Sequence, residues 1–384
     1  MVLFRNNIMR PVIYQLFVRH FSNFTTGGMP WGDKETNGCG TFNGVTDTAL
    51  EQIARMGVSH VWFTGVLRHA TQTAHEGIPA DPACIVKGKA GSPYAVTDYF
   101  DVDPDLAETP AERLDEFAAL LARCRRWGMV PIIDFVPNHV SRNYLSRVRP
   151  EHSFGACDDV RSFFARDNSF YYLEPHGTDT PMQLPGGEFL PERGKGRVTG
   201  NNVASWNPGA YDWYETAKLN YGTDYRHGSH AATMLPSLLA PEYALPRTWR
   251  LMNEVLAYWQ NIGVGGFRCD MAHMVPLPFW RWIIAHARLR DRSAYFIAEG
   301  YDDHMKLVEG PVHQALLSAG FDGVYDGEAY ESLRKVYESG AAVPMLDKLH
   351  APDSPLFRGG VRYIENHDEP RIASPLYWGG AGSI

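Results

Sequence analysis

The regular alternation of short apolar runs with amphipathic segments is the feature that most constrains the fold of this chain. Apolar runs of strand length recur along the sequence, and between them lie segments with the helical period of about 3.6 residues. The strand candidates are residues 12–18, 58–63, 130–135, 265–270, 294–299, 321–325 and 362–366, and the clearest helix candidates are 45–56, 110–127, 246–262 and 278–287. Strand followed by helix, repeated in this way, is typical of a (β/α) barrel.

We therefore predict an α/β protein built on a TIM (β/α)8-type barrel. Residues 1–138 are expected to form the first part of the barrel and residues 245–384 the second part. Residues 139–244 carry many Gly, Pro, Asn and Tyr residues without clear periodicity, so we predict an inserted subdomain there, after the third strand. The sequence offers one strand candidate fewer than a closed barrel needs, and we expect the barrel to be incomplete at its C-terminus.

Composition and charge argue against several classes of protein. A formal net charge of -8 does not suit a nucleic-acid surface, because neutralising phosphates needs clustered Lys and Arg. The five cysteines are odd in number and form no C-x-x-C pair, which argues against a disulfide framework and a zinc ribbon. Polar residues interrupt every apolar run near the N-terminus, so no secretory or membrane segment is indicated. We expect a cytoplasmic protein with no nucleic-acid and no membrane partner.

Carboxylates follow three of the strand candidates. Asp270, Glu299 and Asp368 stand where the fourth, fifth and seventh candidates run out, which is where catalytic groups lie in a barrel. Cleavage of a glycosidic bond with retention needs two carboxyl groups about 5–5.5 Å apart, and adjacent strands lie about 4.7–4.9 Å apart. Taken singly, each carboxylate is also consistent with a helix N-cap or a salt bridge.

Arg268 lies two residues before Asp270 and therefore on the same face of its strand. A fixed guanidinium there holds Asp270 ionised as a nucleophile, although the same pairing fits a structural ion pair. Aromatic side chains of the irregular region fit packing and sugar binding equally well. They are Trp206, Trp213, Tyr214 and Tyr221.

Four short segments resemble the signature segments of the α-amylase superfamily, in the order of that family. They read DFVPNH at 134–139, GFRCD at 266–270, AEG at 298–300 and NHDE at 366–369. The likeness covers nearly the whole chain, from VIYQLF at 12–17 through Tyr94 and DYF at 98–100. It implies a TIM barrel with an inserted domain after strand three, a retaining glycosidase mechanism and an α-glucan or maltooligosaccharide substrate.

The resemblance also implies residue roles. Asp270 would form the covalent glycosyl intermediate, Glu299 would act as acid/base with a raised pKa, and Asp368 would stabilise the transition state. Arg268 would orient Asp270. The further expected roles are hydrogen bonds from His139 and His367 to the sugar in subsite -1, stacking of Tyr94 on that sugar, an acceptor-side role for His273, and structural support from Asp134 and Asn138.

Two departures from the family pattern carry predictions. Many relatives bind calcium with the Asn before the signature His and an Asp ahead of a Leu-Asn pair, but Lys218 precedes Leu219 here. Since a lysine ammonium cannot ligate a cation, we predict no metal and no cofactor, although Asn138 is present. Exo-acting α-glucosidases of the superfamily often carry an Asp directly after the tyrosine equivalent to Tyr94. Ala95 stands at that position, which favours oligomeric or polymeric α-1,4-glucans.

Other functions stay open on the sequence. The same chemistry serves a transglycosylase or isomerase that passes the glycosyl group to a sugar, as in maltosyltransferases or trehalose synthases. The missing strand candidate also fits a truncated, inactive, glucan-binding relative. A metal-dependent enzyme on the same barrel would need a compact set of ligands drawn from His139, Asp270, Glu299 and His367.

Overall fold

The computed structural model describes residues 10–174, 179–227, 236, 240–241, 244–341, 343–344 and 354–374. Its centre is a sheet of parallel strands in the order β1-β2-β5-β10-β11-β12-β13. The order of these strands across the sheet is the same as their order along the chain. The strands are β1 Ile13–Phe17, β2 His60–Thr64, β5 Val130–Phe135, β10 Gly266–Cys269, β11 Tyr295–Ala298, β12 Gly323–Tyr325 and β13 Gly360–Val361.

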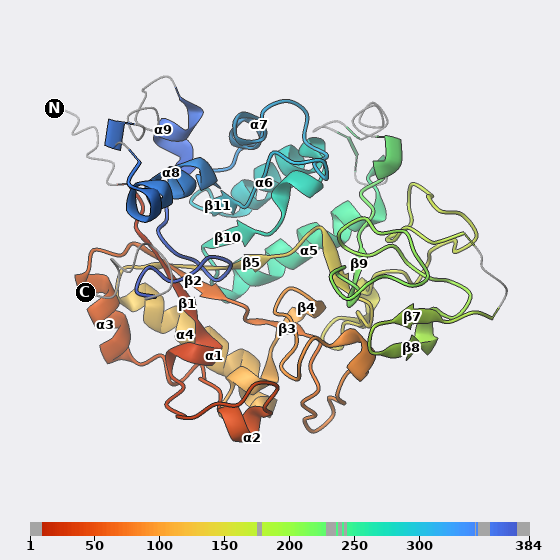
Figure 1. Ribbon diagram of the computed structural model, residues 1–384, viewed down its shortest axis with the longest axis horizontal. Coiled ribbons are helices and arrows are strands. Elements are labelled where there is room, and N and C mark those ends of the chain that lie inside the picture. Colours follow the sequence, from red (N-terminus) through yellow and green to blue (C-terminus); the bar gives the residue numbers. More distant parts are fainter. Residues whose placement is uncertain are drawn as a thin grey trace.

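Helices cover the outside of this sheet, with α3 and α4 below the strands and α6, α7 and α8 above them in Figure 1. The main helices are α3 Asp47–Arg55, α4 Arg113–Arg126, α5 Arg247–Ile262, α6 Leu277–Arg290, α7 Val312–Ala319 and α8 Gly327–Ser339, and the short ones are α1 Val18–Phe21, α2 Lys34–Asn37 and α9 Pro355–Gly359. Local chemistry sets their ends. The Thr46 side chain accepts from Ala49 N at the start of α3, and Gly263 ends α5 in a left-handed conformation.

Side chains of the strands alternate between two cores, as the period of two requires. Trp62, Ile132, Ile297 and Tyr325 form a cluster on the inner side of the curled sheet. Phe63, Ile133, Phe267 and Phe296 belong to the large cluster between strands and helices. The curled sheet and its outer helices are those of an incomplete barrel, in agreement with the predicted α/β class.

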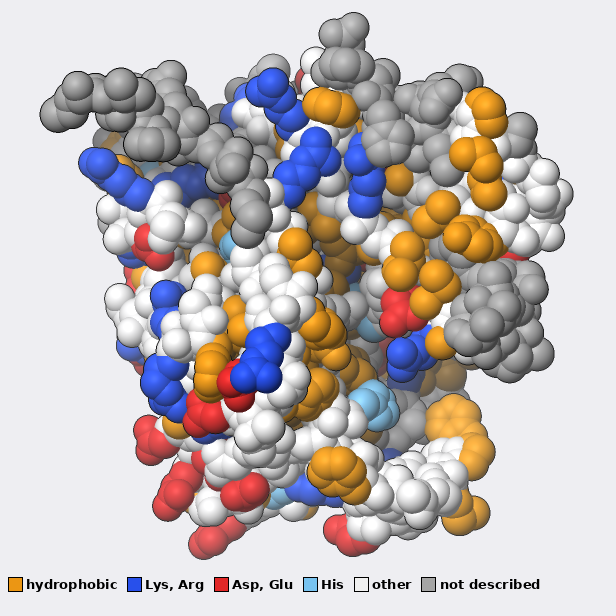
Figure 2. All heavy atoms as spheres, turned by 90° about the vertical axis from the view of Figure 1, so that its left-hand side faces the viewer, with side chains coloured by type: hydrophobic (Ala, Val, Ile, Leu, Met, Phe, Trp, Pro, Cys, Tyr) orange, Lys and Arg blue, Asp and Glu red, His pale blue; other side chains and the backbone are white. Residues whose placement is uncertain are grey.

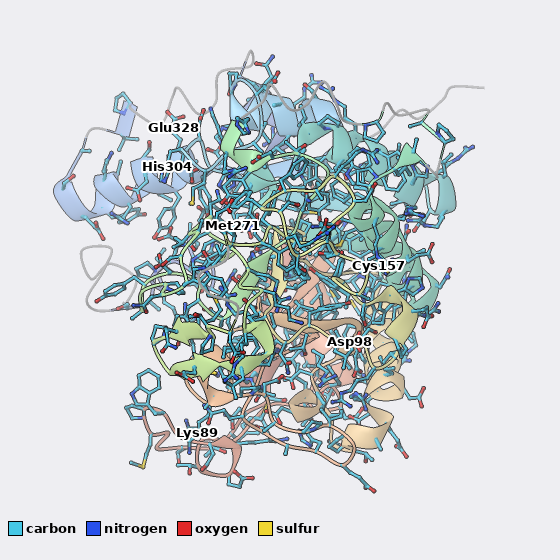
Figure 3. The ribbon with its side chains drawn as sticks, turned by 90° about the vertical axis from the view of Figure 1, so that its right-hand side faces the viewer. Lys89, Asp98, Cys157, Met271, His304 and Glu328 are labelled. Atoms are coloured by element: carbon cyan, nitrogen blue, oxygen red, sulfur yellow. The ribbon has the colours of Figure 1, made fainter. Side chains whose placement is uncertain are left out.

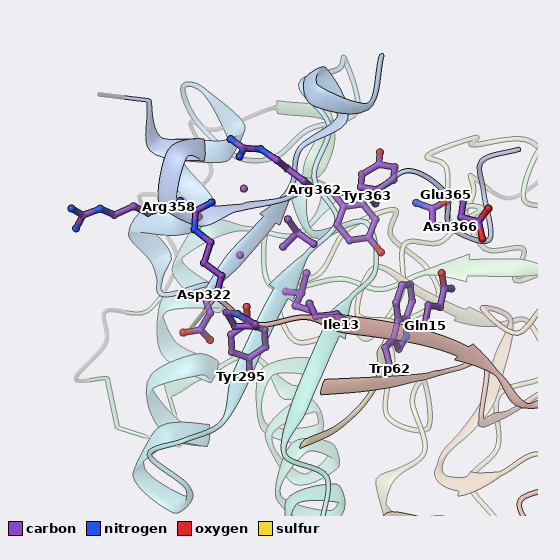
Figure 4. Close-up of a pocket in the computed structure, with 18 residues that line it drawn as sticks. Ile13, Gln15, Trp62, Tyr295, Asp322, Arg358, Arg362, Tyr363, Glu365 and Asn366 are labelled. Carbon is purple, nitrogen blue, oxygen red and sulfur yellow. The ribbon is translucent and has the colours of Figure 1, made fainter. Parts of the chain in front are cut away.

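The two edges of the sheet face each other across an opening. Strands β1 and β13 each pair on one side only within the described part of the chain. A cavity of about 310 Å³ lies beside these edges, lined by Ile13, Trp62 and Tyr325 among others, and Figure 4 shows Arg358 and Arg362 at its rim. The surface view of this side is hollowed, with apolar side chains in the walls of the hollow (Figure 2).

The seventh strand differs from its prediction. The sequence favoured a strand over residues 362–366, whereas the strand found is Gly360–Val361 and the chain leaves the sheet after it. Two side chains attach this segment to the start of α8. Arg362 Nε donates to Asp326 Oδ2 at 3.3 Å, and the Tyr363 ring stacks on Tyr330. His367 and Asp368 therefore lie on a turn rather than at the end of a strand.

The described residues between 139 and 244 contain short antiparallel pairs, of which β7, β8 and β9 lie to the right in Figure 1. The pairs are β6 His139–Ser141 with β9 Thr216–Lys218 and β7 Met182–Leu184 with β8 Gly187–Phe189. Between β2 and α4 lies the antiparallel pair of β3 Leu67–His69 and β4 Val96–Val102. Both regions share one apolar cluster, which includes Ile85 and Phe189. That residues 139–244 form a separate subdomain stays a prediction.

Helix length and hydropathy bear on the membrane expectation. In the part of the chain that the structure describes, no helix combines the length and apolar character needed to cross a bilayer. The longest helix of this part, α5, has charged side chains such as Arg250 and Glu254 along its length.

Candidate active site

Two of the predicted carboxylates meet at one arginine. Asp270 directly follows β10 and Glu299 directly follows β11, which are neighbours in the sheet. Arg268 Nη1 donates to Asp270 Oδ1 at 2.7 Å, and Nη2 lies 2.9 Å from Glu299 Oε2. Because parallel strands end at the same edge of a sheet, residues 29 positions apart in the chain reach the same guanidinium.

The guanidinium of Arg268 is fully buried, with 0% exposure. Its Nε donates to Tyr325 Oη at 3.2 Å, and its Cζ lies 5.1 Å from the centre of the Trp62 ring and 5.4 Å from that of Tyr94. Aromatic faces and carboxylates together compensate a buried cation. Arg268 is therefore enclosed by partners on several sides and contacts both carboxylates at once.

Asp134 supports this arrangement from β5. It accepts from Gly65 N at 2.8 Å and Trp62 Nε1 at 3.2 Å, and it lies 3.7 Å from Arg268 Nη1. Burial raises the pKa of Asp134 to about 6, against the opposing effect of Arg268. Asp134 thus holds Trp62 and the β2 end in place behind the carboxylate pair.

The protonation of the pair runs against the sequence expectation. Burial raises the pKa of Asp270 well above its usual range, and the neighbouring Glu299 raises it further. Burial also acts to raise the pKa of Glu299, but Arg268, Met271 N and the Tyr301 hydroxyl outweigh it and leave that pKa lowered. A raised pKa on Glu299 was expected. The two pKa shifts have opposite directions because Glu299 receives more donors than Asp270 does.

Met271 contributes through its backbone. It adopts the left-handed region, with φ 45°, directly after Asp270. In this conformation its N–H donates to Glu299 Oε2 at 2.9 Å. A non-glycine residue there carries strain, and here the strained turn links the two carboxylates.

His367, Tyr94 and Asp368 form a second group of predicted residues. Tyr94 Oη lies 2.6 Å from His367 Nε2, the two rings stack at 5.4 Å, and Gln15 Nε2 lies 2.9 Å from His367 Nδ1. His367 Nε2 is also 3.3 Å from Asp368 Oδ2. Burial lowers the pKa of His367 to about 4, so the ring is neutral at pH 7. Asp368 is half exposed and its pKa is raised by burial and by Glu299.

His139 and Asn138 complete the predicted set from the end of β5. Asn138 Nδ2 lies 3.1 Å from His139 Nδ1, and burial lowers the pKa of His139 to about 3. Lys218 Nζ donates to Asn138 Oδ1 at 2.7 Å, and burial lowers the pKa of this lysine to about 7. The oxygen that a cation would use is therefore occupied by an ammonium group.

Part of this predicted set lines one cavity of about 380 Å³, whereas Arg268, Asp134 and Asn138 are not among the residues of its wall. Asp270, Glu299, Asp368 and both histidines line it, and its wall also includes residues that the sequence did not single out for this site. They are Lys87, Ser92, Glu215, Thr216, Met271 and Tyr301. All come from loops or strand ends, where no periodic pattern marks a residue as functional.

His273 is not brought to the cavity. The left-handed turn at Met271 leads into a short 3-10 helix, Ala272–Met274, which buries His273 completely. Its Nε2 lies 3.3 Å from Asp303 Oδ2, and its ring meets Tyr301 edge-on at 5.5 Å. Any influence on an acceptor sugar would therefore pass through Tyr301.

The described strands form an incomplete barrel, and a pair of carboxylates lies at the ends of two adjacent strands, in the wall of a cavity. A family model of the alpha-amylase catalytic domain matches residues 15–315, and the chain belongs to the α-amylase family. The recognition of this family from four sequence segments is thereby confirmed.

Individual relatives are distant. Cyclomaltodextrinase of Geobacillus thermopakistaniensis is 20% identical over 372 residues, which cover 94% of this chain and 50% of that protein. A maltose-1-phosphate maltosyltransferase of Pseudomonas aeruginosa is 24% identical over 266 residues, 68% of this chain and 30% of that one. The crystal structure of an α-amylase from Lactobacillus plantarum matches with a TM-score of 0.59 at 23% identity, covering 94% of this chain and 64% of that chain.

The chain thus spans half or less of the length of these two curated relatives. The family contains glycoside hydrolases as well as transferases, as the two names indicate. The structural match supports the shared fold.

Proposed function

We propose that this chain is a retaining α-glycosidase that cleaves α-1,4-glucans or maltooligosaccharides through a covalent glycosyl-enzyme intermediate. The observation that carries the proposal is the buried Arg268, which holds Asp270 and Glu299 at 2.7 and 2.9 Å in the wall of one cavity. Retention requires two carboxyl groups close to one glycosidic bond, and contact with the same guanidinium brings these two close to each other.

Asp270 is the nucleophile in this proposal. Its Oδ1 accepts from Arg268, whereas its Oδ2 is buried and accepts no hydrogen bond from the described residues. That free oxygen is the one that attacks the anomeric carbon. Arg268 stabilises the carboxylate and also sets its direction.

Glu299 is the acid/base. The bond to the leaving oxygen breaks as Glu299 donates its proton to that oxygen, and Glu299 then takes a proton from the incoming water. The acid step requires Glu299 to carry a proton when a sugar is bound, and its electrostatic interaction with Asp270 links the protonation of the two carboxyl groups. Met271 N and the Tyr301 hydroxyl orient Glu299 throughout.

The remaining predicted residues hold the sugar. Tyr94 offers a ring face, which suits the apolar C–H groups of a pyranose. His139 and His367 line the same cavity, and we propose that a hydroxyl group of the sugar replaces one of the partners that their ring nitrogens have here. Asp368, at the same cavity, stabilises positive charge that develops on the sugar ring.

The chain's own residues do not suit the calcium that many relatives bind. Lys218 Nζ lies 2.7 Å from Asn138 Oδ1 and so takes the oxygen that a cation would need, and a lysine side chain cannot itself ligate a cation. No cluster of His, Cys, Asp or Glu fit to hold a metal is present among the residues described. We propose that Lys218 takes over the structural task of an ion.

Hydrolysis and transfer use the same covalent intermediate and differ in the acceptor. The similarity to cyclomaltodextrinase and the buried Ala95, which provides no carboxylate for clamping a terminal glucose, favour hydrolysis within oligosaccharides. The similarity to a maltosyltransferase keeps transfer to a sugar as the second candidate.

The test compares the 384-residue chain with Asp270→Asn on maltoheptaose, measuring reducing ends and product lengths. We expect new reducing ends from the wild type and a loss of at least about 10³-fold in kcat for the variant, which keeps the shape of the site. Equal rates would refute Asp270 as nucleophile. Products longer than maltoheptaose without new reducing ends would favour the transferase.

A further inference from the structure

A second pair of opposite charges lines the catalytic cavity. Lys87 and Glu215 are both part of its wall, and Lys87 Nζ lies 3.1 Å from Glu215 Oε2. Lys87 comes from the loop between β3 and β4, and Glu215 stands directly before β9. The pair therefore joins two segments, far apart in sequence, that border the cavity.

Glu215 is buried, with 5% exposure, yet one of its oxygens lacks a donor. Its Oε2 accepts no hydrogen bond from the described residues, because Lys87 Nζ lies at ion-pair distance without hydrogen-bond alignment. Leaving a buried carboxylate oxygen without a donor is costly. In the wall of a sugar cavity, a hydroxyl group is the donor that would complete it.

The surroundings hold the Glu215 backbone and the Lys87 side chain in place. The carbonyl of Glu215 accepts from Arg142 N at 3.0 Å, which extends the β6–β9 pairing by one residue. Lys87 Nζ lies 3.3 Å from the Asp212 carbonyl and 5.0 Å from the centre of the Tyr214 ring. Trp213, between these contacts in sequence, also lines the cavity, with its ring 5.2 Å from that of His139.

We propose that Glu215 and Lys87 bind neighbouring hydroxyl groups of the sugar unit next to the one that Asp270 attacks, with the Trp213 ring beside them. A carboxylate accepts from one hydroxyl and an ammonium donates to the next. The two charges cancel, which suits a neutral glucan rather than a phosphorylated sugar. The pair determines where along the cavity a glucan chain binds, and therefore which bond is cleaved, but it does not contact the reacting atoms. This inference rests on the proposed glucan activity.

The experiment measures binding of maltoheptaose by calorimetry in the Asp270→Asn background, to which Glu215→Ala, Glu215→Gln or Lys87→Met is added. We expect Kd to rise about 10- to 100-fold for Glu215→Ala, less for Glu215→Gln, which keeps an acceptor oxygen, and about 10-fold for Lys87→Met. In active enzyme, Glu215→Ala is expected to shift the position at which maltoheptaose is cut and to raise KM more than it lowers kcat.

Lys89→Met is the matched control. Lys89 lies in the same loop, pairs with Asp33 at 3.3 Å and is absent from the cavity wall, and Figure 3 places it well away from Met271. The Lys89→Met variant should bind maltoheptaose and cleave it in the same pattern as the protein without this substitution.

Two outcomes overturn the inference while glucan activity stands. The first is unchanged Kd and cleavage pattern in Glu215→Ala. The second is a loss of maltoheptaose binding that is as large in Glu215→Gln as in Glu215→Ala and is accompanied by a lower Tm. That result would give the pair a structural role alone. A different result would refute the proposed function itself: the wild type does not cleave maltoheptaose and the Asp270→Asn variant does not bind it. The inference would then fail together with the proposed function.

Discussion

Replacing Lys218 by Met should change how stability depends on pH. Lys218 is 1% exposed and its pKa in the folded protein is lowered from 10.5 to about 7 by burial. The unfolded chain therefore binds more protons than the folded one between about pH 7 and 10.5, so the free energy of unfolding rises with pH across this window. From pH 7 to pH 9 this linkage amounts to about 2 kcal/mol.

Lys218→Met removes the titrating group and so should remove that rise. The assay is urea denaturation at pH 7, 8 and 9, with the wild-type free energy of unfolding compared with that of the variant at each pH. The variant also leaves Asn138 Oδ1 without its donor, which costs about 1–3 kcal/mol at every pH and does not alter the slope.

Lys89→Met, which removes a half-exposed lysine, serves as the control and should keep the wild-type slope. Other groups that titrate above pH 7 contribute equally to all three proteins, so they cancel in the comparison. The decisive quantity is the difference in the free energy of unfolding between wild type and Lys218→Met. If this difference changes by less than about 0.5 kcal/mol from pH 7 to pH 9, Lys218 does not have a pKa lowered by burial.

Two further predictions follow from the same site. Because Lys218 occupies the position of a cation, EDTA should leave both activity and Tm unchanged, and metal analysis that finds one bound calcium per chain would contradict this. Tyr301→Phe removes the hydroxyl that donates to Glu299 Oε1 at 3.1 Å and helps to lower the pKa of that carboxyl. The pKa of Glu299 should rise, so the alkaline limb of kcat against pH should move to higher pH; an unmoved limb, with wild-type binding retained, would argue against Glu299 as the acid.

The fold was largely predictable because buried parallel strands are continuous apolar runs. Residues 130–135 coincide with β5, and 246–262 differ from α5 by one residue. Helices α7 and α8 were not predicted: α7 is short, and α8 is largely polar, with two buried residues. The strand predicted at 362–366 was wrong because contacts of Arg362 and Tyr363 with α8 and its cap, distant in sequence, decide the path of the chain.

The grouping of the site residues was predictable, but its electrostatics were not. Strand ends and family segments indicated Asp270, Glu299 and Arg268, which the structure brings together. The opposite directions of the two pKa shifts depend on donors such as Tyr301, which only the folded chain supplies. Likewise, nothing in the sequence near Glu215 indicates that Lys87, 128 positions earlier, lies beside it. The catalytic roles themselves stay predictions until the variants are measured.

The left-handed turn at Met271 has a consequence for engineering this chain. A residue forced to positive φ costs about 1–2 kcal/mol, and glycine would relieve most of that cost. A search for heat-resistant variants would therefore favour Met271→Gly. The same change would loosen the N–H that aims Glu299, so the selected proteins would gain melting temperature at the expense of turnover. Screens at this position should score both properties together.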